Sequence, residues 1–155
     1  MTEDRQRPSG RVLALDLGQR RIGLALSDEL RLTAQGLETL QRTNMREDLA
    51  RLARLVEEKA VSTIVLGNPI RMNGTEGPRS EWVRHFAQKL EARTGREVRL
   101  WDERLTTVEA ARVLRESGIS REKQGRAVDR LAAVILLKSY LDAVGESGPT
   151  GQFSA

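Results

Sequence analysis

The 155-residue sequence contains no cysteine and only one histidine. Disulfide bonds, thiolate metal sites and cysteine nucleophiles are therefore excluded, which agrees with a reducing compartment. The sequence also lacks a run of about 20 apolar residues that could span a bilayer, and its first residues lack the apolar core of a signal peptide. We therefore expect a soluble, cytoplasmic protein with no membrane partner.

Aromatic residues are also scarce, since the chain has two Trp, one Tyr and two Phe. Few rings are available for stacking on unpaired bases, so binding to nucleic acid would depend mainly on contacts to its backbone. Lys and Arg total 26 against 22 Asp and Glu, and most of the basic residues are Arg, whose planar fork suits phosphate. This balance is compatible with a polyanionic partner, although mixed charges that merely solvate the surface would explain it equally well.

The pattern of apolar residues predicts one domain over residues 11–144, with flexible tails at 1–10 and 145–155. The predicted strands cover residues 11–17, 22–28, 31–40, 62–67 and 98–101. The predicted helices cover residues 45–59, 80–93, 106–116 and 127–144. This order indicates an α/β fold with a mixed five-stranded sheet, in which an antiparallel meander is followed by parallel strands and helices pack on the faces.

One carboxylate interrupts the apolar sequence VLALDLGQRRIGLALSD. Asp16 stands between Leu15 and Leu17, one residue before the predicted turn between the first two strands. Burial of an unpaired charge is costly, so this side chain must have partners. It either accepts hydrogen bonds from the backbone of the turn or belongs to a functional site, and Asp16 alone does not decide between the two.

Two further acids, Asp102 and Glu103, directly follow the last predicted strand. The ends of strands are where open α/β sheets place groups that bind ligands. Alternatively, both acids interact with the dipole of the predicted helix that follows. Strand alternation puts Asp102 on the face of Val98 and Leu100, and Glu103 on the opposite face, so only one of the two acids should reach a site shared with Asp16.

Asp129 is the third candidate, at the start of the most apolar predicted helix. An acid in the first turn of a helix can simply complement its dipole. If Asp16, Glu103 and Asp129 instead converge, their repulsion would require a cation among them. Such oxygen ligands suit Mg²⁺ or Mn²⁺ better than Zn²⁺. One or two such ions are typical of enzymes that catalyse in-line displacement at a phosphorus atom.

Four motifs in this order resemble a known family: ALDLGQRRIGLALSD, IVLGNPIRMNGTEGP, VRLWDERLTTVEA and GRAVDRLAAVILLKSYL. This is the YqgF-type, or RuvX-type, family of pre-16S rRNA processing nucleases and Holliday-junction-resolvase homologues. The resemblance covers about residues 11–143 and implies a ribonuclease-H-like fold. It also implies that Asp16, Glu103 and Asp129 are the catalytic, metal-binding triad.

The resemblance further implies that the loop at 68–77 borders the active site and that Arg20, Arg104 and Arg126 lie near substrate phosphates. Each of these arginines could equally be solvated or paired with an adjacent carboxylate. The implied function is metal-dependent endonucleolytic processing of the 5′ end of pre-16S rRNA. The alternatives are a resolvase acting on branched DNA, for which a dimer would be expected, and a non-catalytic nucleic-acid-binding module in transcription. The sequence is compatible with a monomer or a homodimer.

Overall fold

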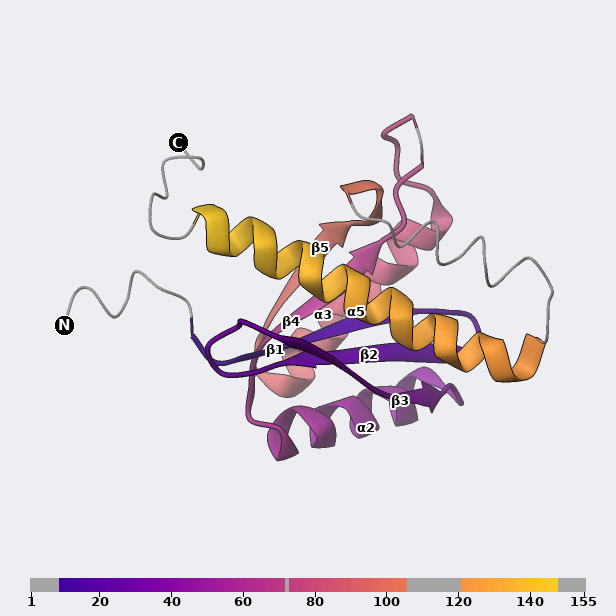
Figure 1. The fold of residues 1–155 in the computed structure, drawn as a ribbon. Helices are drawn as coiled ribbons and strands as arrows, with labels where there is room; N and C mark the ends of the chain where they lie inside the picture. The colour runs from indigo at the N-terminus through magenta and orange to yellow at the C-terminus, as the bar shows by residue number, and fades with distance from the viewer. Residues whose placement is uncertain (1–8, 72, 106–120, 148–155) are drawn as a thin grey trace.

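Five strands form one mixed sheet in the computed structural model, which describes residues 9–71, 73–105 and 121–147 (Figure 1). The strands are β1 (Arg11–Leu17), β2 (Arg21–Ser27), β3 (Ala34–Gln41), β4 (Val61–Asn68) and β5 (Glu97–Asp102). Their order in the sheet is β3-β2-β1-β4-β5. β1 pairs antiparallel with β2, and β2 with β3, whereas β4 runs parallel to both β1 and β5. The predicted mixed sheet is therefore confirmed.

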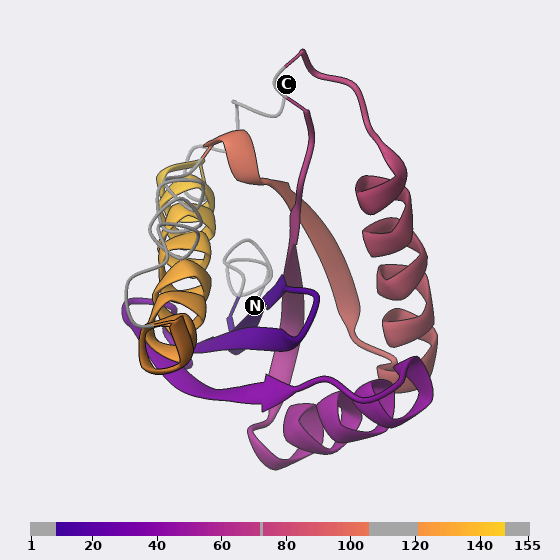
Figure 2. The same ribbon diagram turned by 90° about the vertical axis from the view of Figure 1, so that its right-hand side faces the viewer.

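The helices lie on both faces of this sheet. They are α2 (Met45–Glu58), α3 (Pro78–Thr94) and α5 (Arg121–Ser147), and the short 3-10 turn η1 (Glu103–Leu105) follows β5. Figure 2 shows α5 on one side of the sheet and α2 and α3 on the other. Among the helices described, none is long and apolar enough to cross a membrane.

Strand alternation divides the core into two layers. Along β1, Val12 and Ala14 pack with α5, whereas Leu13 and Leu15 pack in the layer that also contains buried side chains of α2 and α3. Because successive side chains of a strand point to opposite faces, Asp16 lies on the α5 side, together with Val12 and Ala14. The candidate carboxylate is therefore directed toward the most apolar helix of the chain.

A capping residue marks the start of α2, and another marks the end of α3. The side chain of Asn44 accepts a hydrogen bond from the N–H of Glu47 at 2.9 Å and so caps the start of α2. α3 ends at Gly95, which adopts φ 70°, a left-handed conformation that glycine takes without steric cost.

The start of α5 differs from the expectation. The helix begins at Arg121, not at residue 127, and passes through Gly125, which a helix tolerates at a cost of about 1 kcal/mol. Asp129 therefore lies about two turns inside the helix, and its interpretation as a first-turn acid is wrong. α5 also continues to Ser147, beyond the predicted end at 144.

Several predictions fall outside the described residues. These are the helix at 106–116 and most of both tails, so the boundaries of the domain stay a prediction. The described end of the N-terminal tail is held in place, because Gly10 donates its N–H to the carbonyl of Glu29 at 3.0 Å.

Candidate active site

Asp16 lies in a row of residues that crosses the sheet on its α5 side. Its carboxylate is buried, with 1% of the residue exposed. On one side Asp16 is paired with Gly23 of β2. On the other side, Leu15 is paired with Leu66 of β4, so the parallel register brings Gly67 next to Asp16. The two strands that flank Asp16 therefore both present glycine beside it.

Gly23 allows α5 to approach the sheet closely. A Cβ atom at this position would collide with the backbone carbonyl oxygen of Asp129 and lie 3.0 Å from its carbonyl carbon. The absence of a side chain at Gly23 thus lets the helix place Asp129 over β2, one strand away from Asp16. Asp129 is itself buried, with 3% of the residue exposed.

Gly67 has the corresponding role for Glu103. A Cβ atom at Gly67 would lie 2.5 Å from Oε2 and 3.1 Å from Cγ of Glu103. Gly67 follows Val65 by two positions, and Val65 packs in the α5 layer, so Glu103 lies over β4 on the same side of the sheet as Asp16. Glu103 is 7% exposed. The two glycines therefore bring Glu103 and Asp129 to opposite sides of Asp16.

Asp102 has a different environment from Glu103. Its carboxylate accepts hydrogen bonds from the backbone N–H of Arg104 at 2.9 Å and from Arg104 Nη2 at 2.8 Å. The hydrogen bonds from the Arg104 side chain, and to a smaller extent the one from its backbone, hold the pKa of Asp102 below its usual value. Asp102 is thus committed to a local ion pair, and Glu103 is the acid that shares a face with Asp16.

Asp129 forms an ion pair across the interface between β2 and α5. Nε of Arg21 donates a hydrogen bond to Oδ2 of Asp129 at 2.8 Å, and 4% of the Asp129 side chain is exposed. Arg21 precedes Gly23 by two positions in β2 and therefore lies on the same face of the sheet. The guanidinium of Arg21 thus fixes this buried side chain from the edge of β2.

The donors at this site suit a divalent metal ion in their chemistry. Three buried carboxylates on one side of the sheet supply the oxygen ligands that Mg²⁺ and Mn²⁺ prefer. Among the side chains that the structure describes, however, no three acidic or histidine groups are gathered closely enough to hold an ion together. A cation would have to compete with Arg21 for Asp129.

The three arginines expected near substrate phosphates have different surroundings. Arg20 is exposed in the turn between β1 and β2. Arg104 is bound to Asp102, and its Nη1 lies 3.6 Å from the position of a Cβ atom on Gly74, so the loop at 68–77 approaches it. The side chain of Arg126 lies outside the described part of the chain.

The sequence interpretation missed Arg21 and the role of Gly67. Alternation along β2 could have placed Arg21 near the site, because a residue two positions before Gly23 lies on the same face of the sheet as Gly23. Two further arginines, also missed, support the turn after Asp16. Arg42 donates from Nη1 to the carbonyl of Gly18 at 2.8 Å, and Arg79 donates from Nη2 to the carbonyl of Leu17 at 2.7 Å. Bonds between residues so far apart in the sequence cannot be predicted from the local sequence pattern.

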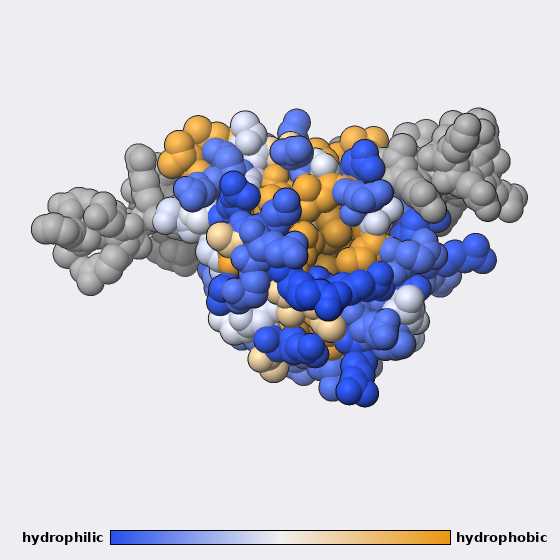
Figure 3. All heavy atoms as spheres, turned by 90° about the horizontal axis from the view of Figure 1, so that it is seen from below, coloured by the Kyte–Doolittle hydropathy of each residue, from blue (hydrophilic) through white to orange (hydrophobic). Residues whose placement is uncertain are grey.

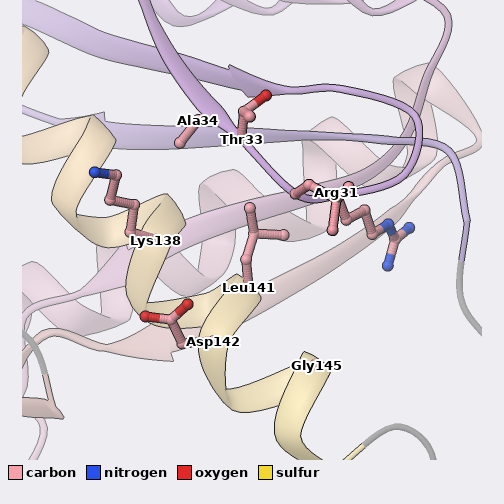
Figure 4. A pocket seen from close by; sticks show the side chains of 8 residues that line it. Arg31, Thr33, Ala34, Lys138, Leu141, Asp142 and Gly145 are labelled. Carbon is pink, nitrogen blue, oxygen red and sulfur yellow. The ribbon is translucent and has the colours of Figure 1, made fainter.

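A separate hollow of about 780 Å³ lies between the segment before β3 and the C-terminal half of α5 (Figure 4). Figure 4 shows the guanidinium of Arg31 directed away from Lys138 and Asp142. Nε of Arg31 donates to the carbonyl of Gly10 at 2.8 Å, so this side chain anchors the chain before β1. Burial lowers the pKa of Arg31. None of the three candidate carboxylates lines this hollow, so it is distinct from the carboxylate site.

Comparison with curated proteins finds close relatives along most of the chain. A protein of Koribacter versatilis with the name "Putative pre-16S rRNA nuclease" is 52% identical over 136 residues, which cover 88% of this chain and 89% of that protein. A protein of the same name from Moorella thermoacetica is 48% identical over 138 residues, covering 89% of this chain and 99% of its own.

Comparison with solved structures identifies the fold. RuvC of Thermus thermophilus in complex with a Holliday junction substrate superimposes with a TM-score of 0.53 at 13% identity, covering 86% of this chain and 96% of its own. The fowlpox virus resolvase in complex with Holliday junction DNA gives a TM-score of 0.52 at 13% identity, with coverage of 86% and 98%. These similarities show a shared ribonuclease-H-like fold.

A sequence profile of the RuvX family, described as Holliday junction resolvase, matches residues 10–143. The matched segment contains Asp16, Glu103 and Asp129, together with both glycines beside Asp16. The chain belongs to the RuvX family and has the ribonuclease-H-like fold.

Proposed function

We propose that this chain is a metal-dependent endonuclease that hydrolyses phosphodiester bonds in structured nucleic acid, and that its substrate is the 5′ end of pre-16S rRNA. The observation that carries the proposal is the position of Asp16 between Gly23 and Gly67, with Asp129 and Glu103 packed over these glycines. The names of the relatives favour pre-16S rRNA as the substrate. This function places the protein in the cytoplasm.

Asp16, Glu103 and Asp129 are the proposed ligands of Mg²⁺ or Mn²⁺. When bound, such an ion lowers the pKa of a coordinated water and stabilises negative charge on the leaving oxygen. The chain itself supplies rigidity, because Asp16 lies within a central strand and its neighbours Leu15 and Leu17 are buried. Rigid strands hold functional side chains more accurately than loops do.

Substrate binding is assigned to arginines around the carboxylates. Arg20 is exposed in the turn directly before β2, and Arg104 lies beside the loop at 68–77. We assign both side chains, together with Arg126, to contacts with phosphates of the substrate. A guanidinium presents a planar fork of donors that matches the oxygens of a phosphate.

The proposal is tested by cleavage of a precursor rRNA model in Mg²⁺, in Mn²⁺ and in EDTA. Asp16→Asn and Glu103→Gln are expected to reduce cleavage by more than about a hundredfold, since loss of groups that merely support a metal ligand already costs about 10–100-fold. Asp102→Asn is the matched control and should keep cleavage within about tenfold. Cleavage that survives both chelation and Asp16→Asn would exclude the carboxylate mechanism.

A second candidate function is resolution of branched DNA. The description of the RuvX family and the two resolvase structures favour it. A four-way DNA junction should therefore be tested beside the RNA, together with the oligomeric state, because symmetric cleavage of a junction requires two paired sites. A homodimer that cuts the junction in preference to the RNA would support this candidate, whereas a protein that binds but cleaves neither substrate would be a non-catalytic module.

A further inference from the structure

Four arginines line one groove on the side of the molecule opposite α5. The groove has a volume of about 480 Å³ and lies between α2 and the C-terminal end of α3. Arg46, Arg51 and Arg54 of α2 and Arg93 of α3 line it, and we call it the arginine groove. Figure 3 shows the side of the molecule on which α2 lies, where hydrophilic side chains surround a smaller apolar area.

The positive charge of the arginine groove is only partly neutralised. Arg51 pairs with buried Asp48 at 2.8 Å and also donates to the carbonyl of Gln41. Arg46, Arg54 and Arg93 are exposed, and none of them has an ion pair or a side-chain hydrogen bond within the described parts of the chain. Glu47 is the one acid among the described residues that line the groove. Three guanidiniums therefore line one groove without an ion pair to any residue that the structure describes.

Such a cluster is expected to attract a polyanion. Like charges held near one another repel, so the arrangement gives no benefit to the folded chain alone. A nucleic-acid backbone removes this repulsion because its phosphates pair with the guanidiniums and release condensed counterions. The described lining contains no aromatic residue, which suits contacts to the backbone rather than to bases.

The arginine groove begins close to the turn that follows Asp16. Asn44, the capping residue of α2, lines the groove and lies two positions after Arg42. The N–H of Arg42 donates to the carbonyl of Arg20 at 2.8 Å, and its side chain donates to the carbonyl of Gly18. The exposed turn with Arg20 therefore adjoins the segment that leads into the groove.

We propose that the arginine groove binds the sugar–phosphate backbone of the RNA substrate outside the segment that is cleaved. The RNA passes from the carboxylates along the turn at Arg20 and reaches the groove on the opposite face of the sheet. The identity of this ligand rests on the proposed function, because it takes structured RNA as the substrate. Contacts in the groove add affinity and position the RNA without reading its sequence.

The test measures binding in EDTA, so that no cleavage is needed. A labelled precursor rRNA model is titrated with wild type and with Arg54→Ala/Arg93→Ala between about 50 and 200 mM salt. The matched control, Arg99→Ala/Lys138→Ala, also removes two exposed cations, one from β5 and one from α5. An unchanged thermal unfolding midpoint shows that each variant is folded.

The groove variant is expected to bind RNA about tenfold more weakly, with the slope of log K against log salt reduced by about 1.4–1.8 for two lost phosphate contacts. The control should stay within about twofold of wild type, and Arg54→Lys/Arg93→Lys should recover part of the affinity because it keeps both charges. Wild-type affinity and slope in the groove variant would overturn the proposal, as would an equal loss in the control. A loss confined to a four-way DNA junction would overturn the assignment to RNA.

Failure of this proposal can be separated from failure of the proposed function. If wild type cleaves the RNA and the groove variant binds and cleaves it equally well, the groove proposal is wrong while the nuclease assignment stands. If the groove variant loses RNA binding but wild type cleaves no substrate, the nuclease assignment is wrong while the groove proposal stands.

Discussion

Nε of Arg21 lies 2.8 Å from Oδ2 of Asp129 and joins β2 to α5 across 108 positions of the sequence. The contact gives one of the three candidate carboxylates a positive partner within the protein. A divalent cation at the site would therefore compete with a guanidinium for Asp129. Because of this competition, the gain in stability on binding a divalent metal ion should depend on the side chain at position 21.

Arg21→Ala should lower the free energy of unfolding in EDTA by about 1.5–3 kcal/mol, the usual range for a hydrogen bond to a charged group. Mg²⁺ should stabilise this variant more than it stabilises wild type, because the ion no longer competes with Arg21 and a ligand that binds the folded state raises its stability. Thermal unfolding with and without Mg²⁺ measures both effects. Arg21→Lys is the charge-keeping control, and an equal loss with and without Mg²⁺ would contradict the prediction.

Gly23→Ala should destabilise the fold. The new methyl group would collide with the backbone carbonyl of Asp129, and a helix backbone cannot move aside as a side-chain end can. We expect a loss of about 1–3 kcal/mol, typical of overpacking, in urea unfolding. Gly145→Ala, in α5, is the control, since a Cβ atom there meets nothing within 4 Å. Wild-type stability of Gly23→Ala would mean that α5 does not pack on β2 as described.

Gly67→Ala should impair cleavage more than stability. The added methyl group would meet the side chain of Glu103, whose carboxylate can swing away at small cost. Displacement of a functional group by about 1 Å can reduce activity by about a hundredfold, and we expect a loss of that order with a change in unfolding free energy below about 1 kcal/mol. Cleavage assays and urea unfolding of the same preparation separate the two. Full activity would show that the position of Glu103 over Gly67 is not needed.

The stability that the Asp102–Arg104 pair supplies should depend on pH. Hydrogen bonds from Arg104 lower the pKa of Asp102 in the folded chain, so the unfolded chain binds the proton more readily. The contribution is then present above the usual carboxyl pKa near 3.8 and is lost as the pH falls through the lower folded value.

Wild type should therefore be more stable than Asp102→Asn near pH 7, and the difference should shrink steadily below about pH 4. Denaturant unfolding at a series of pH values measures it. Arg104→Ala should remove the same increment, and its combination with Asp102→Asn should add little because both changes break one interaction. A difference that grows toward acid would have the wrong sign.

The local sequence pattern was sufficient to predict most strands and the helix ends that have clear capping residues. Alternation along β1 puts Asp16 on the same face as Val12 and Ala14, and in the structure these two apolar residues pack with α5. Asn44 and Gly95 were recognisable as helix ends because capping uses the chain's own neighbouring backbone. These features depend on residues only a few positions apart.

The start of α5 could not be predicted in this way. Gly125 is compatible with either the end of a loop or the interior of a helix, since its cost of about 1 kcal/mol is small beside the energy of packing. Asp48 is a further example, because helical spacing alone did not show that this acid of α2 is buried among Arg42 and Arg51. In both cases tertiary contacts outweigh the local preference.

The sequence by itself determined which residues alternate, which ends are capped and which carboxylates stand at the ends of strands. Only the tertiary structure decided that Gly23 and Gly67 lie on either side of Asp16, that Glu103 shares its face, and that Arg21 rather than Arg20 contacts Asp129. Sheet register and helix docking join residues far apart in the sequence, such as Arg21 and Asp129 at 108 positions, and such contacts are set by packing across the whole core rather than by neighbours in the chain.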